Sequence, residues 1–169
     1  MEKTIKIDGK KVTLKATAGA LVRYKQQFGT DYIDDLCKFK TLDESDKSKI
    51  VEMYVKIGYQ LIWSMAKTAD SKIPSPDLWI KKLKKIDIDN LLSEATALFD
   101  MSMAGVEDCE DGGEPISAES LLAVSLSCGL NTTDIDNLSM SMLLNTIKEY
   151  CELRDSGDNE QAYFDSFRR

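Results

Sequence analysis

Residues 4–29 read TIKIDGKKVTLKATAGALVRYKQQFG, and the spacing of the apolar residues changes within this stretch. In residues 4–7 and 12–15 apolar and polar residues alternate, as they do in a strand with one buried face. Asp8-Gly9 between the two runs is a strong signal for a β-hairpin turn. Because an isolated hairpin is only marginally stable in water, we expect its apolar face to pack on helices.

The remaining sequence has the apolar spacing of helices, beginning at Ala18 and first interrupted at Gly29. We expect the later helices to begin at side chains that accept hydrogen bonds from the first free N–H groups. The expected starting residues are Asp31, Thr41 with Glu44 in a capping box, Ser75 before Pro76, Asp87, Ser117, Thr132 or Thr133, and Ser139. The longest apolar stripe contains Ile50, Tyr54, Ile57, Leu61 and Met65. The predicted fold class is therefore mainly α, with an N-terminal β-hairpin packed on helices.

Residues 106–115 interrupt the helical pattern with five acidic residues, a Gly-Gly pair and a proline. We interpret them as an acidic linker between a helical domain with the hairpin, residues 1–105, and a small helical domain, residues 116–169. Residues 1–105 carry 18 Lys and Arg against 15 Asp and Glu, whereas residues 106–169 carry 4 against 14. A net charge of +3 beside one of −10 indicates that the two parts bind different partners or each other.

The residue types give little support for catalysis. The chain contains no histidine, and none of its four cysteines forms a C-x-x-C pair. The absence of histidine removes the commonest general base and a frequent zinc ligand. The segment DIDN at residues 87–90 lacks the glycine and the glutamate that complete an EF-hand loop, and the pairs Asp34-Asp35 and Asp134/Asp136 are more typical of helix caps and solvated surface. We predict that the protein is not an enzyme and has no catalytic, cofactor-binding or metal-binding residues.

Composition also bears on where the protein resides. The chain lacks the apolar run of roughly 18 to 20 residues that crosses a bilayer, and its N-terminus lacks the apolar stretch of a signal peptide. The acidic second part would repel phosphates, and the basic run at residues 81–85 is short enough to be a solvated helix face. We therefore expect a cytoplasmic protein that binds neither membrane nor nucleic acid.

Sulfur-containing residues allow two interpretations. Met101, Met103, Met140 and Met142 lie on either side of the expected linker. Methionine packs adaptably and is common both on promiscuous binding surfaces and in ordinary cores, so both interpretations stay open.

Trp79, at helical spacing from Leu83, is expected in the core. Cys128 and Cys151 fall in apolar helical patterns and are expected to be small buried hydrophobic residues.

Three stretches of the sequence resemble one known family. The first, residues 5–36, contains KATAGALVRY at residues 15–24 and FGTD at residues 28–31. The second, residues 65–80, contains MAKTAD, IP and DLWI, and the third, residues 126–144, contains CGL, DI and LS. Together they are similar to the tail assembly chaperones of long-tailed, siphovirus-type bacteriophages. The resemblance is to the longer of the two forms in that family, which adds a second domain after a linker.

The resemblance implies a role in virion assembly inside the host cytoplasm. Such a chaperone binds the tape-measure protein and keeps it soluble, and its downstream domain recruits subunits of the major tail-tube protein. Self-association is a further expectation. Two alternatives from the residues alone stay open: a cytoplasmic helical adaptor or regulatory module, and a structural component of the tail.

Overall fold

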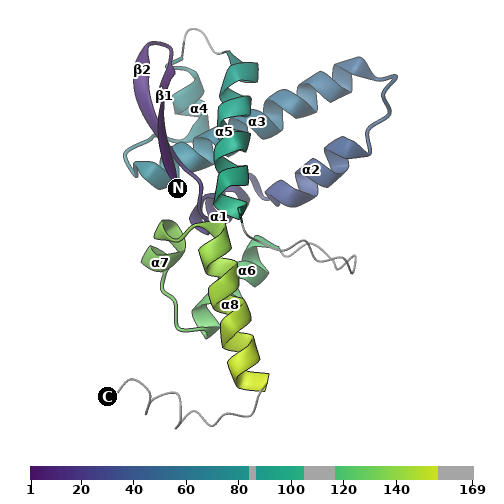
Figure 1. The fold of residues 1–169 in the computed structure, drawn as a ribbon. Coiled ribbons are helices and arrows are strands. Elements are labelled where there is room, and N and C mark those ends of the chain that lie inside the picture. The colour runs from purple at the N-terminus through teal and green to yellow at the C-terminus, as the bar shows by residue number, and fades with distance from the viewer. Residues whose placement is uncertain (84–86, 105–116, 156–169) are drawn as a thin grey trace.

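The computed structural model describes residues 1–83, 87–104 and 117–155. This part of the chain is mainly helical with one N-terminal antiparallel hairpin, which confirms the predicted fold class (Figure 1). Its elements are β1 (Glu2–Ile7), β2 (Lys10–Lys15), α1 (Ala18–Phe28), α2 (Tyr32–Lys40), α3 (Lys47–Ala69), α4 (Pro76–Ile80), α5 (Ile88–Met103), α6 (Ala118–Ser127), α7 (Thr132–Asn137) and α8 (Met140–Asp155). Residues 106–115, predicted to be an acidic linker, lie outside the described residues, and the division into domains 1–105 and 116–169 stays a prediction.

The hairpin turns at the predicted dipeptide. Asp8 and Gly9 both have positive φ angles, 50° and 76°, as a two-residue turn between right-twisted strands requires. Antiparallel pairing places Ile5 opposite Val12. The apolar face, with Ile7 and Leu14 almost completely buried, packs on α3 and α5 as expected.

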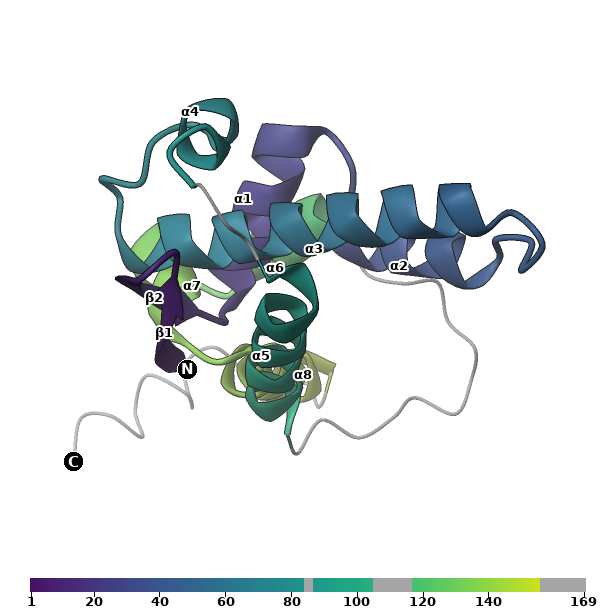
Figure 2. The ribbon, with the colours of Figure 1, turned by 90° about the horizontal axis from the view of Figure 1, so that it is seen from above.

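Helix α3 is the centre of the fold. Every residue from 57 to 66 except Tyr59 is buried, because α1, β2 and α5 all pack around this part of the helix. Helix α5 approaches most closely at Gly58, where a Cβ atom would lie 3.2 Å from the Leu92 side chain. Figure 2 shows α3 crossing the molecule, with the hairpin beside its C-terminal half and α2 alongside its N-terminal half.

Helices α6, α7 and α8 pack directly on the elements formed by the first hundred residues. Helices α6 and α7 contact α1, and α8 contacts the C-terminal end of α5 (Figure 1). Leu121, Ile135, Met140 and Leu143 join the same hydrophobic core as Leu21. The described part of the chain therefore has one continuous core.

Several helices begin at the predicted caps. The Asp87 side chain accepts a hydrogen bond from the Asn90 N–H, and Ser117 does the same for the Ser120 N–H. The Ser139 hydroxyl accepts from the Met142 N–H at the start of α8. Helix α7 begins at Thr132, as predicted, but its cap is the preceding residue, Asn131.

The predicted capping box of Thr41 and Glu44 is wrong. Helix α3 begins at Lys47, and the Asp46 side chain accepts the capping hydrogen bond. Thr41 instead closes the end of α2, where its hydroxyl donates to the Lys38 carbonyl. Its side chain is therefore engaged by the preceding helix. Ser75 precedes α4 as predicted, but its side chain makes no capping hydrogen bond.

Candidate interaction surfaces

A polar cluster is buried where α1, α2 and α3 meet. The Tyr24 hydroxyl lies 2.8 Å from both the Asp35 carboxylate and the Gln60 side-chain oxygen, and the Thr30 hydroxyl donates to Asp35 at 2.7 Å. Burial, followed by the hydrogen bond to Asp35, raises the pKa of Tyr24. Asp35 is only 4% exposed, so the prediction that Asp34-Asp35 is a capping or solvated pair is wrong for Asp35. Because the acceptor oxygens come from α2 and α3, the cluster fixes the orientation of these helices relative to α1.

A second polar contact joins α1 to α7. The Arg23 guanidinium donates two hydrogen bonds to the Asp136 carboxylate, at 2.5 and 2.7 Å. The two helices approach so closely that a Cβ atom at Gly19 would lie 2.0 Å from the Asp136 Oδ1 atom. At one end of this contact Lys15 donates to the Asn137 side chain at 2.6 Å. Asp136, predicted to be a solvated or capping residue, therefore takes part in a specific helix–helix contact.

Asp31 makes a different cap from the predicted one. Its side chain makes no capping hydrogen bond to α2. Instead it accepts hydrogen bonds from the Ala118 N–H at the start of α6 and from the Lys25 ammonium group, both at 2.9 Å. Burial alone would raise the pKa of Asp31, but these two hydrogen bonds outweigh it and lower the pKa below its ordinary value. Asp31 thus connects the start of α2 to the start of α6.

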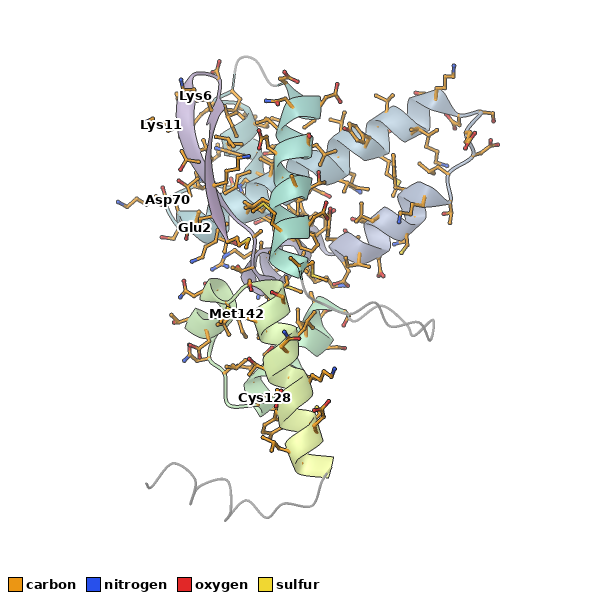
Figure 3. All side chains as sticks on the ribbon, in the orientation of Figure 1. Glu2, Lys6, Lys11, Asp70, Cys128 and Met142 are labelled. Carbon is orange, nitrogen blue, oxygen red and sulfur yellow. The ribbon has the colours of Figure 1, made fainter. Side chains whose placement is uncertain are left out.

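Two of the four methionines meet at the junction of α5 and α8. Met103 and Met140 line an apolar cavity of about 170 Å³, which we call the junction pocket. Its other lining residues are Leu21, Asp31, Tyr32, Ile33, Phe99, Ala118, Leu121 and Leu144. Met101 and Met142 are 56% and 58% exposed, and Figure 3 places Met142 on the end of α8 nearest α5. Met140, only 3% exposed, is part of the core, whereas a role for Met101 and Met142 on a binding surface stays a prediction.

Helix α2 and residues 47–56 of α3 form a two-helix projection, which we call the arm. Its helices lie side by side and extend away from the other elements in both Figure 1 and Figure 2. Phe39 and Tyr54 contact each other between them, with ring centroids 6.1 Å apart. Val51 and Val55, one helical turn apart, are 60% and 41% exposed. The arm therefore presents a short apolar ridge, which sequence reasoning missed because these valines flank the predicted stripe.

The cysteine prediction is only partly correct. Cys128 is half-buried, whereas Cys151 and Cys37 are exposed. Burial and then the proximity of Cys151 raise the pKa of Cys128. Cys151 lies in the second half of α8, where no residue of the helix is buried, so an apolar pattern alone did not predict its exposure. Cys109 lies outside the described residues.

Trp79 and the described part of the basic run at residues 81–85 lie where the sequence predicts. Trp79 is 6% exposed and stacks on Tyr59, as expected for a core residue. Lys81 and Lys82 are exposed, as expected for a solvated face. Lys84 and Lys85 fall outside the part of the chain that the structure describes.

Within residues 1–83, 87–104 and 117–155, no three carboxylate or thiol side chains gather in a way that could hold a metal ion. None of the helices in the same residues is both long and apolar enough to cross a bilayer.

Comparison with models of protein families, with curated proteins and with solved structures finds no match to this chain.

Proposed function

We propose that this chain is a tail assembly chaperone of a long-tailed bacteriophage, acting in the host cytoplasm. In this role it binds apolar helical segments of the tape-measure protein and keeps that protein soluble. Residues 116–169 recruit subunits of the major tail-tube protein. The three stretches that resemble this family support the proposal, together with the features of the arm.

The ridge of Val51 and Val55 carries the proposal. A chaperone for long apolar helices needs a helical surface of its own that is exposed before the partner arrives. Helices recognise each other by packing rows of side chains, and residues four apart form such a row. Burying a valine side chain contributes about 1.5 to 3 kcal/mol relative to leaving it exposed. Covering these two partly exposed valines therefore favours the packing of an apolar helix on the arm.

Co-expression with the tape-measure protein of a long-tailed bacteriophage tests the proposal. The unaltered chain is expected to keep that protein in the soluble fraction. The double variant Val51→Asp, Val55→Asp places two charges on the ridge, and with it the tape-measure protein should aggregate. Leu78→Asp is the control. Leu78 is an exposed apolar residue like the two valines, with 55% of its surface exposed, but it lies on α4, away from the arm. An equal loss with the control, or no loss with the arm variant, would contradict the proposal.

A separate measurement tests the second partner. The proposal expects the full chain to capture purified tail-tube subunits, and charge-reversing substitutions at exposed residues of α8, such as Glu149→Lys, to weaken this capture. Mass spectrometry of purified virions should not find the chain. Its stoichiometric presence there would instead support a structural tail component.

A further inference from the structure

The junction pocket lies between parts of the chain that are distant in sequence. Tyr32 and Phe99 form its wall from α2 and α5, and Leu121 and Leu144 form the opposite wall from α6 and α8. Among the described residues, Ile33, Met103 and Leu144 are only half-buried, so the pocket reaches the surface. It is separate from the ridge of Val51 and Val55.

Its size and lining suit one aromatic ring. Apolar cavities of about 150 Å³, lined by leucine, isoleucine and phenylalanine, stay free of water and take up benzene. The junction pocket has about 170 Å³ and a similar lining, apart from Asp31. The Asp31 carboxylate is already engaged by Ala118 and Lys25. The pocket therefore offers little to a polar group and enough room for a phenyl side chain.

Three acidic residues adjoin lining residues of the pocket in sequence. Asp34, Asp100 and Glu119 are exposed, and each follows a lining residue directly in sequence. Burial and the nearby Asp100 carboxylate raise the pKa of Tyr32 to about 12, which indicates that Asp100 acts on the pocket wall. Lys25 and Lys38 are the neighbouring cations: Lys25 is engaged by Asp31 and Glu119, and Lys38 acts on the Asp31 carboxylate. A partner segment at this site gains from positive charges on either side of its apolar anchor.

We propose that the junction pocket is a docking site for one aromatic side chain of a basic amphipathic helix in a partner protein. This inference rests on the proposed function and deepens it, because it gives the tape-measure protein a second contact site on this chain. The exposed side chains of Met101 and Met142 adjust to the incoming helix, as flexible thioether side chains do on other helix-binding surfaces. Met103 and Met140 contact the inserted ring.

The experiment uses the full chain and a synthetic helix of about 18 residues, long enough for five turns. The peptide contains Lys, Ala and Leu in amphipathic order and one central Phe. Calorimetry measures its affinity, and methyl NMR of the methionines reports where it binds. We expect ring-current shifts at Met103 and Met140 and none at Met65, which is fully buried in α3. Shifts at Met53 would report separate binding at the arm. Replacing the central Phe with Ala should weaken binding roughly 30-fold, as the loss of an anchor residue does. Replacing the Lys residues with Glu should weaken it further.

A pocket-filling variant provides the second measurement. Met103→Trp places a large ring in the cavity and should abolish peptide binding while leaving the melting temperature unchanged or raised. Ile73→Trp is the matched control, because Ile73 is also half-buried but belongs to neither the pocket lining nor the arm. Peptide binding that persists in Met103→Trp, or methyl shifts at Met53 alone, would overturn the inference. A concentration-dependent dimer that disappears in Met103→Trp would also overturn it, because a second copy would then be the occupant.

The outcomes separate this inference from the proposed function. If Met103→Trp keeps the tape-measure protein soluble and the arm variant does not, the pocket inference fails and the proposed function stands. If the peptide binds at Met103 and Met140 but the unaltered chain leaves the tape-measure protein insoluble, the docking site stands and the proposed function fails.

Discussion

The two halves of α3 belong to one continuous helix but have opposite surroundings. Residues 57–66 are buried on nearly all sides, whereas none of residues 47–56 is buried. Both halves are rich in apolar residues, so composition alone does not separate them. The difference comes from what packs around the helix: α1, β2 and α5 surround the second half, while α2 is the neighbour of the first. Apolar side chains in the second half maintain the fold, whereas Val51 and Val55 in the first half are exposed.

The largest expected effect is in the buried half. Leu61 has no exposed surface, so Leu61→Ala should remove about 2 to 5 kcal/mol from the free energy of unfolding by leaving a cavity. Urea denaturation measures this loss. A comparable truncation at an exposed position of the first half, Val51→Ala, should change the free energy of unfolding by no more than about 0.5 kcal/mol. Equal losses at the two positions would contradict the difference between the halves.

The next largest loss of stability is expected at the contact between α1 and α7. Gly19→Ala places a methyl group against Asp136, which must move and give up its hydrogen bonds to Arg23. We expect a loss of about 2 to 3 kcal/mol, in the upper part of the range for overpacking. Hydrogen exchange should increase in α7 and not in the buried half of α3. Combining Gly19→Ala with Asp136→Ala should cost less than the sum of the single variants, because the second change removes the clash.

Asp31 predicts a smaller, pH-dependent effect. Its pKa is lower in the folded state than in the unfolded chain, so its charged form stabilises the fold above the unfolded value of about 3.9. This contribution is lost as the pH falls through the folded-state pKa. Asp31→Asn should cost about 1.5 kcal/mol at neutral pH, the value of a charged hydrogen bond. Urea titrations at pH 7 and pH 3 should show the difference between the variant and the unaltered chain shrinking in acid; a constant difference would argue against this role.

The smallest effect on stability is expected on the arm. The double variant Val51→Asp, Val55→Asp should leave the free energy of unfolding within about 0.5 kcal/mol of the unaltered chain, because both side chains already face water. Its melting curve should therefore overlay that of the unaltered chain. A cooperative loss of structure would mean that the ridge packs within the fold and is not available to a partner.

Features decided by neighbouring residues were predictable from the sequence. The hairpin turn at Asp8-Gly9 and the caps at Asp87 and Ser117 depend on contacts within three residues. The capping box at Thr41 failed because two adjacent helices compete for one side chain, and only the three-dimensional ends of α2 and α3 decide between them.

Features decided by distant residues were not predictable. Asp31 is a residue type that commonly caps helices, and it directly precedes α2. The backbone N–H that it accepts from nevertheless belongs to Ala118, 87 positions away. Arg23 and Asp136 are 113 positions apart, and nothing in the local pattern of either residue indicates the other. The methionines were recognised as unusual, but the meeting of Met103 and Met140 at a pocket depends on how α8 docks against α5.

Because Arg23 and Asp136 are far apart in sequence, α1 leaves the ribosome well before α7, the helix that covers part of it. Helix α1 is synthesised more than a hundred residues before the helix that covers part of it. At bacterial and eukaryotic elongation rates of about 5 to 20 residues per second, this part of α1 stays uncovered for roughly 5 to 20 s. During that interval the nascent chain exposes Leu21 and the surface beside Gly19, which the finished fold encloses. Translation speed therefore sets how long another molecule has access to this surface.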